Sequence, residues 1–237
     1  MPAQLRRFLP LIIVALAALL FFATGLHREI TLEALQQRQA ELARLVATHF
    51  GAVLLVFFVS YVIAISLSLP LAMVLSILGG FLFGAWLATP IIVIASTLGS
   101  TIFFLLVKHA IGHHFHDRAR GWIARLENGF RENAFNYVFV LRLIPVAPLF
   151  MVNLIAGLLD VKTRDFVIAT FLGMFAWSFI FASVGYGLRL AFHAGESTDP
   201  AAALRSAIFS PEIMLALGAL AVLGLAPVII KRVRARA

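Results

Sequence analysis

The sequence predicts an all-α membrane protein whose multi-pass helices include two inverted re-entrant hairpin repeats, and three observations support this fold class. First, 62% of the 237 residues are hydrophobic and only 13% are charged, whereas soluble domains are about half apolar and a quarter charged. Second, the 63 residues from Leu45 to Val107 contain no charged side chain, and about 20 apolar helical residues cross a bilayer. Third, one motif bounded by proline and glycine occurs twice.

The first charge-free stretch, Phe8 to His27, predicts an N-terminal transmembrane helix within residues 1–27. A secretory signal is the alternative, because the small residues Ala23 and Gly25 would suit a cleavage site. We favour an uncleaved helix, since the apolar run exceeds the roughly 7–15 residues of a signal core. Residues 28–48 follow as an extracytoplasmic segment with the periodicity of an amphipathic helix.

The distribution of charge predicts the orientation. If both termini, the loop around residues 108–131 and the turn at 162–164 share one side, that side carries 13 bases and five acids, and the other carries five bases and six acids. The positive-inside rule then places both termini in the cytoplasm, and we expect a bacterial inner (plasma) membrane. Residues 45–107 connect opposite sides of the membrane in this orientation, so they must cross it an odd number of times. They do so either as three spans or as a re-entrant hairpin plus one span.

An internal repeat favours the hairpin. The segment Pro70 to Gly79 matches Pro148 to Gly157 at six of ten positions without a gap. Proline removes an amide donor and disfavours helix in the preceding residue, while glycine permits sharp turns. Two Pro-kinked helices with ordinary packing are the alternative. Broken backbone inside a membrane must be buried in protein or line a wet cavity, so two inverted hairpins predict a substrate path where their tips meet.

We therefore expect a core over residues 49–190 that contains both repeats. Its parts are a first hairpin at about 56–87, a transmembrane helix at 88–110, a cytoplasmic amphipathic segment at 112–133, a second hairpin at about 135–158 and a transmembrane helix at 165–189. Residues 191–237 are expected to form an extracytoplasmic loop, a C-terminal transmembrane helix and a basic cytoplasmic tail.

The residues around the repeat resemble the DedA, or VTT-domain, superfamily of membrane proteins, in its SNARE-associated-Golgi-protein-type branch. The resemblance is carried by Leu69-Pro70, Gly79-Gly80-Phe-Leu-Phe-Gly84, Gly99, Lys108, and Leu141-Arg142-Leu-Ile-Pro145-Val-Ala-Pro148 running to Asn153 and Gly157. It implies two facing re-entrant loops and movement of lipids between leaflets. Some members are proposed to return undecaprenyl phosphate, and some eukaryotic relatives to scramble phospholipids.

The sequence departs from this family in its acidic residues. Several members carry acids near the first re-entrant region that are linked to proton coupling, whereas residues 45–107 contain none. Ser100 follows Gly99 where a relative can have Asp. This departure argues against proton-driven transport and leaves passive exchange.

Arg142 is the main candidate for substrate contact, because a guanidinium keeps its charge and can bind a phosphate through two hydrogen bonds. Inside an apolar segment it requires a polar or anionic partner; the alternatives are snorkelling to the cytoplasmic surface or bonding to carbonyls freed by Pro145 and Pro148. Asn153 is a further donor or a partner for broken backbone. The full set of expected substrate-binding residues is Arg142, Asn153, Pro145, Pro148, Gly157, Pro70, Gly79, Gly80, Gly84 and Lys108.

Other chemistries lack their residues. Cysteine is absent, and His109 and His113 have helical spacing without the Glu of a zinc-protease motif, so neither a metal nor another cofactor is expected. No nucleophile elbow, P-loop or close pair of acids in an apolar segment is present, so we do not expect an enzyme.

The sequence thus predicts a scramblase-like or flippase-like transporter of an anionic phospholipid or a polyprenyl phosphate. Two alternatives remain: a proton- or ion-coupled transporter of small solutes, and a non-transporting organiser that binds partners through amphipathic helices. The expected partners are membrane lipids with anionic headgroups and not nucleic acid, whose binders carry their bases on a polar face. Assembly into a homo-oligomer is left open.

Overall fold

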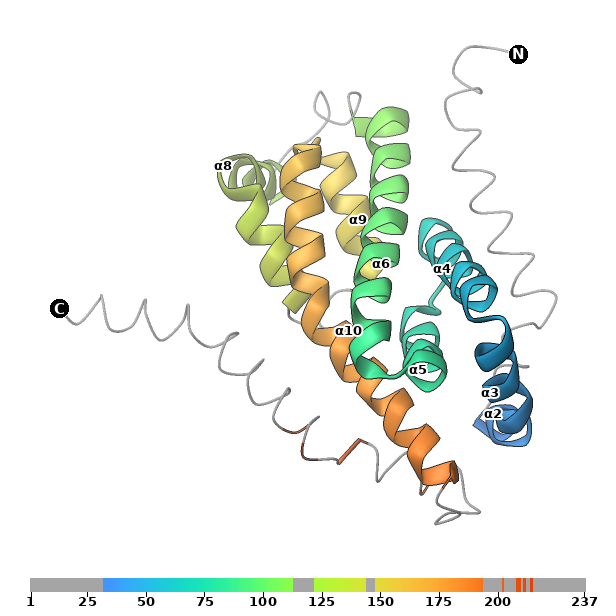
Figure 1. The fold of residues 1–237 in the computed structure, drawn as a ribbon. Coiled ribbons are helices and arrows are strands. Elements are labelled where there is room, and N and C mark those ends of the chain that lie inside the picture. The colour runs from blue at the N-terminus through green and yellow to red at the C-terminus, as the bar shows by residue number, and fades with distance from the viewer. Residues whose placement is uncertain are drawn as a thin grey trace, which may run out of the picture.

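The fold is built entirely of helices in the part of the chain that the structure, a computed structural model, describes. That part comprises residues 32–112, 122–143 and 148–193, with the isolated positions 202, 208, 209, 211 and 214. The expected helix within 1–27 and nearly all of 191–237 lie outside these residues. Figure 1 shows α6 and α10 side by side at the centre, with the shorter helices around them.

The first repeat begins with two helices that precede the expected hairpin. Helix α2 (Leu32–Gln37) leads into α3 (Gln39–Thr48), and α3 meets α4 (Phe50–Ser66) at an angle of 110°. The chain then turns through residues 67–71 into α5 (Ala72–Phe83). The first hairpin therefore consists of α4, a turn that contains Pro70, and α5, and α4 begins before the expected boundary at residue 56.

A glycine connects this hairpin to the first long helix. Gly84 has φ of +80°, which lies in the left-handed region that glycine adopts without steric cost. Helix α6 (Ala85–Val107) follows at once and ends in a π-helical turn, η2 (Lys108–Gly112). The expected transmembrane segment at 88–110 thus begins three residues earlier in the structure.

The second repeat has the same order of elements. Helix α8 (Trp122–Leu143) is broken at Asn133, whose φ of −142° and ψ of 44° are not helical. Pro148 begins the turn into α9 (Leu149–Leu158), because its missing amide hydrogen is not needed at a helix start. After a short turn, α10 (Thr163–His193) runs the full length of the core.

The contacts between the helix ends show that the two repeats are inverted. Lys108, at the end of α6, donates a hydrogen bond to the carbonyl of Val161, just beyond α9. Arg189, near the end of α10, donates to the carbonyl of Leu82, near the end of α5. Since α5 leads directly into α6 and α9 leads into α10, the two long helices run antiparallel and the two short helices do as well (Figure 1).

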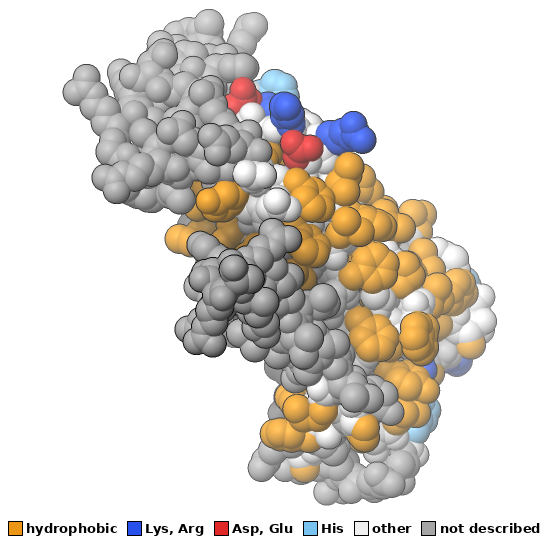
Figure 2. Space-filling model, turned by 90° about the vertical axis from the view of Figure 1, so that its left-hand side faces the viewer, with side chains coloured by type: hydrophobic (Ala, Val, Ile, Leu, Met, Phe, Trp, Pro, Cys, Tyr) orange, Lys and Arg blue, Asp and Glu red, His pale blue; other side chains and the backbone are white. Residues whose placement is uncertain are grey.

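The helices of the core fall into two classes by length. Among the described residues, two helices are long and apolar enough to cross a membrane, Ala85–Ala110 and α10. At 1.5 Å per residue, α5 and α9 reach only about 18 and 15 Å, roughly half of a 30 Å hydrocarbon layer. The surface agrees: Figure 2 shows hydrophobic side chains over the middle of one face and most of its charged side chains at the upper end.

Small residues bring the two repeats into backbone contact. A Cβ on Gly80 of α5 would overlap the carbonyl oxygen of Ala182 in α10, and a Cβ on Gly185 would overlap that of Ile77 in α5. A Cβ on Gly157 of α9 would lie 2.9 Å from Val107 of α6. Each long helix therefore packs closely against the short helix of the other repeat. The expected all-α membrane fold is confirmed.

Candidate functional site

The two hairpin tips line one cavity. Its volume is about 420 Å³, and the first tip contributes Ser68 and Pro70 while the second contributes Pro148 and Asn153. Apolar side chains form most of the remaining wall: Ile65, Leu69, Ala72, Met73, Leu149 and Phe150. We call this space the tip cavity. The matching prolines of the repeat, Pro70 and Pro148, thus lie at the same site although 78 positions separate them.

Arg142 lies directly behind the wall of the tip cavity. Its side chain is only 4% exposed, and its Nη2 donates to Asn153 Oδ1 at 2.5 Å and to Thr170 Oγ1 at 3.3 Å. The guanidinium also lies over the ring of Phe166, 5.6 Å from its centre. Arg142 therefore does not snorkel to the surface.

The position of Arg142 depends on close helix packing. A Cβ on Gly173 of α10 would lie 2.5 Å from the Arg142 Cβ, so the glycine leaves room for α8 to approach. Phe166, one of the contacts of the guanidinium, is itself fixed by stacking on Phe104 of α6 at 4.2 Å between ring centres. Three helices of both repeats therefore determine where the cation lies.

The hydrogen-bonding capacity of this cluster is only partly used. Among the described residues, Arg142 Nε and Nη1 and Asn153 Nδ2 are buried without an acceptor. No carboxylate of the described residues pairs with Arg142. A buried charge without a counter-ion is destabilising by several kcal/mol unless it is compensated. The cluster is therefore chemically suited to a buried anion with several acceptor oxygens, such as a phosphate.

The other residues that were expected to bind substrate lie in different parts of the structure. Gly79 faces Phe57, and Gly80 and Gly157 serve the backbone contacts described above. Gly84 connects α5 to α6 at the end of the hairpin, away from the tip cavity. Pro145 lies outside the described residues, as do three of the clustered histidines, His113, His114 and His116.

Lys108 lies far from the tip cavity and already has an acidic partner. Its Nζ is 3.0 Å from Asp160 Oδ1 and donates to the Val161 carbonyl at 2.7 Å. With Lys162 and Asp165 the pair lines a separate cavity of about 320 Å³. Lys108 thus connects the end of α6 to the turn between α9 and α10, and it is not brought together with Arg142.

Sequence reasoning missed three residues at the site. Thr170 and Phe166, which contact Arg142, are ordinary residues of an apolar span and carry no signal of their own. Ser68 has a φ of +56°, and its buried hydroxyl has no partner among the described residues. Its position two residues before Pro70 was the one available clue. Within the described residues, no group of three or more metal-ligating side chains occurs.

Comparison with known proteins supports the same assignment of the chain. Residues 69–187, half of the sequence, match the VTT domain. The chain belongs to the VTT-domain family. That family lies within the DedA superfamily, and the match covers the chain from the first hairpin tip to the last part of α10.

The chain is also similar to curated VTT-family relatives. It is 29% identical to Transmembrane protein 41B of Danio rerio over 76% of this chain and 61% of the relative. It is 30% identical to the Transmembrane protein 41 homolog of Dictyostelium discoideum over 78% of this chain and 53% of the relative. The human Transmembrane protein 41B is 29% identical over 64% of this chain and 53% of its own length. The chain thus spans between half and two thirds of these relatives, and no solved structure matches it.

Proposed function

We propose that this VTT-family protein moves phospholipids with anionic headgroups, or a polyprenyl phosphate, between the two leaflets of a membrane. The observation that carries the proposal is the buried Arg142 guanidinium, with no carboxylate partner among the described residues, behind the cavity where both hairpin tips meet. A transporter of lipids requires a place for a charged headgroup inside the hydrocarbon, and this cluster meets that requirement.

The geometry supports an order of contacts for the headgroup. Asn153 lines the tip cavity and Arg142 lies behind it, so a phosphate in the cavity meets the Asn153 amide first. Phosphate oxygens then accept from Asn153 Nδ2 and from Arg142 Nε and Nη1, which have no acceptor among the described residues. The apolar wall of the cavity accommodates the glycerol and the first part of the acyl chains, while the rest of the lipid stays in the bilayer.

The proposed orientation follows from charge. The side of the molecule that carries Lys108, Lys162 and Arg164 faces the cytoplasm under the positive-inside rule. The opposite side, with α3 and the end of α10, then faces outward, and the membrane would be the plasma membrane of a bacterium. The tip cavity lies between these two sides, where either leaflet can supply a lipid.

Lipid exchange in proteoliposomes tests the proposal. Vesicles with the purified protein and a headgroup-labelled anionic phospholipid in both leaflets are treated with a membrane-impermeant quencher of the label. Wild-type protein should extend quenching from the outer leaflet to the inner one, whereas Arg142→Ala should leave the inner leaflet protected.

A matched control distinguishes the loss of the buried Arg142 charge from the loss of any one positive charge. Arg164 lies exposed in the first turn of α10, and Arg164→Ala should exchange lipids as fast as wild type. Retained exchange by a folded Arg142→Ala protein would contradict the proposal, as would wild-type vesicles that exchange no faster than empty ones.

A further inference from the structure

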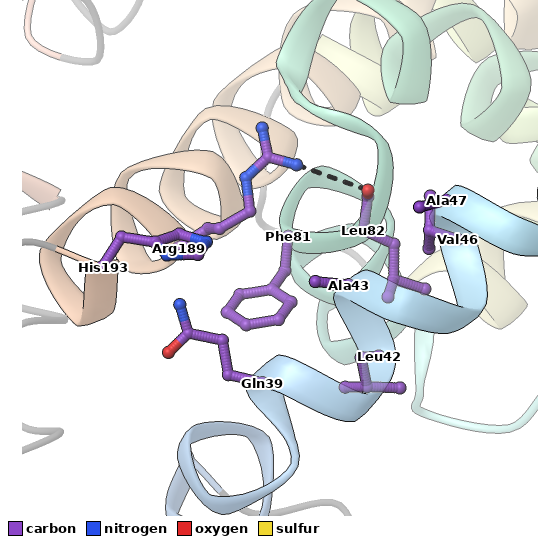
Figure 3. A pocket seen from close by; sticks show the side chains of 9 residues that line it. All are labelled: Gln39, Leu42, Ala43, Val46, Ala47, Phe81, Leu82, Arg189 and His193. Atoms are coloured by element: carbon purple, nitrogen blue, oxygen red, sulfur yellow. Dashed lines mark hydrogen bonds between the residues drawn. The ribbon is translucent and has the colours of Figure 1, made fainter.

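A third cavity lies at the opposite end of the core from Lys108. It has a volume of about 200 Å³ and is formed where α3, the end of α5 and the end of α10 meet. Three polar side chains reach it, those of Gln39, Arg189 and His193, and Figure 3 shows the Phe81 ring beside them. Leu42 and Val46 of α3 form part of its apolar wall. We call this space the α3 cavity.

The charge of Arg189 is not neutralised within the α3 cavity. None of the described residues that line it is an acid. Arg189 Nη1 donates to the Leu82 carbonyl at 3.4 Å, a long hydrogen bond, and the guanidinium lies over the Tyr186 ring at 5.0 Å. A guanidinium carries five N–H donors in a planar fork, and among the described residues Arg189 makes one hydrogen bond, to the Leu82 carbonyl.

The inverted repeat supplies an internal comparison for the end of the short helix that this cation contacts. In the alignment that matches Pro70 to Pro148, Leu82 corresponds to Asp160. At the Lys108 end, the cation bonds to a carbonyl of the turn after α9 and also pairs with the Asp160 carboxylate at 3.0 Å. At the Arg189 end, the residue in the corresponding position is Leu82, which offers its carbonyl alone.

The surroundings of Arg189 suit an amphiphilic ligand. Helix α3 directs Leu42 and Val46 toward the cavity, while Glu41 and Arg44 are exposed elsewhere on it and Arg38 is exposed just before it. Such a helix lies at the boundary of headgroups and acyl chains, and its bend of 110° from α4 suits that placement. The cavity thus combines apolar walls with an amide, an imidazole and a guanidinium that pairs with no carboxylate among the described residues.

We infer that the α3 cavity is a binding site for the phosphate of an anionic phospholipid, with Arg189 as its main ligand and Gln39 and His193 as additional donors. This site is separate from the tip cavity, and binding there does not require that the protein transports lipids. In the proposed orientation it loads lipid from the outer leaflet.

Lipid retention measured by native mass spectrometry tests the inference. Purified protein is titrated with phosphatidylglycerol, and with zwitterionic phosphatidylcholine for comparison. Arg189→Gln keeps a donor for the Leu82 carbonyl but removes the charge, so it should weaken phosphatidylglycerol binding about tenfold or more, the loss expected for hydrogen bonds to a charged group. Arg44→Gln, on the exposed side of α3, should bind as wild type does, and Arg189→Lys should retain part of the affinity.

Three results would overturn the inference. The first is equal affinity of wild type and a folded Arg189→Gln protein for phosphatidylglycerol. The second is an equal loss in Arg44→Gln, which would indicate a diffuse surface charge. The third is displacement of the lipid by inorganic phosphate at comparable concentration, which would assign the site to a soluble anion. Failure of the proposed transport is distinguishable, because Arg142→Ala would then leave lipid exchange unchanged while Arg189→Gln still lowers lipid retention.

Discussion

The Arg142–Asn153 contact allows stability and function to be separated by a double-mutant cycle. Asn153→Leu removes the acceptor of the 2.5 Å hydrogen bond and leaves Nη2 with Thr170 at 3.3 Å. A hydrogen bond to a charged group contributes about 1.5–3 kcal/mol. Arg142→Met leaves the Asn153 amide, 1% exposed, without its partner, at a cost of about 1–3 kcal/mol.

The double variant should recover much of this loss. Replacing both partners of a buried polar pair by apolar side chains of similar size is often nearly neutral. We therefore expect Arg142→Met with Asn153→Leu to be more stable than the sum of the single variants predicts, by about 1.5–3 kcal/mol. At about 2–4 °C per kcal/mol for a chain of this size, the difference is several degrees in Tm.

Thermal unfolding in detergent, followed by tryptophan fluorescence, measures the cycle. Arg164→Met combined with Asn153→Leu is the control, and its effects should add because Arg164 is exposed and distant. The reasoning would be refuted if the effects of Arg142→Met and Asn153→Leu also simply added. The stable double variant should also have lost lipid exchange.

Two further predictions concern packing and the Lys108 end. Gly80→Ala should lower Tm by several degrees, because the new methyl group overlaps the Ala182 carbonyl. Gly51→Ala is the control: a Cβ at this position has no neighbour within 4 Å, so Tm should be unchanged or slightly raised. Equal Tm values for the two variants would contradict the close contact of α5 and α10. Asparagine adopts the φ of +52° at position 160 as aspartate does, so Asp160→Asn removes the charge without straining the backbone. The variant should be less stable by about 1 kcal/mol or less, since the ion pair with Lys108 is partly exposed. A loss of stability that is as large in high salt as in low salt would contradict a role of Asp160 as an ion-pair partner.

Much of the fold follows from patterns that are local in the sequence. Charge-free stretches of spanning length predict α6 and α10, and the repeated Pro and Gly predict the short helix that precedes each of them. The start of α4 was harder to predict, because the charge-free block continues through residues 45–55 and the bend at His49 has no proline.

The sequence indicated which residues belong to the site but not which of them contact one another. Arg142 and Asn153 stand out as polar side chains in apolar segments, yet their hydrogen bond across a turn depends on tertiary packing that no spacing indicates. Lys108 resembled a substrate ligand, but its partner Asp160 is 52 positions away and follows a different helix. Arg189 drew no attention from sequence, because a cation at the end of a span is common; that no acid of the described residues pairs with it emerges from the structure.

The central claim is that the hairpin tips meet within the membrane at a largely apolar cavity that polar reagents can enter. The chain contains no cysteine, so single cysteines can be introduced and their reaction with a membrane-impermeant, water-soluble thiol reagent measured in proteoliposomes. Ser68→Cys, in the tip cavity, should react, and Ile94→Cys, 46% exposed on the apolar face of α6, should not. A Ser68→Cys protein as inert as Ile94→Cys would contradict the account.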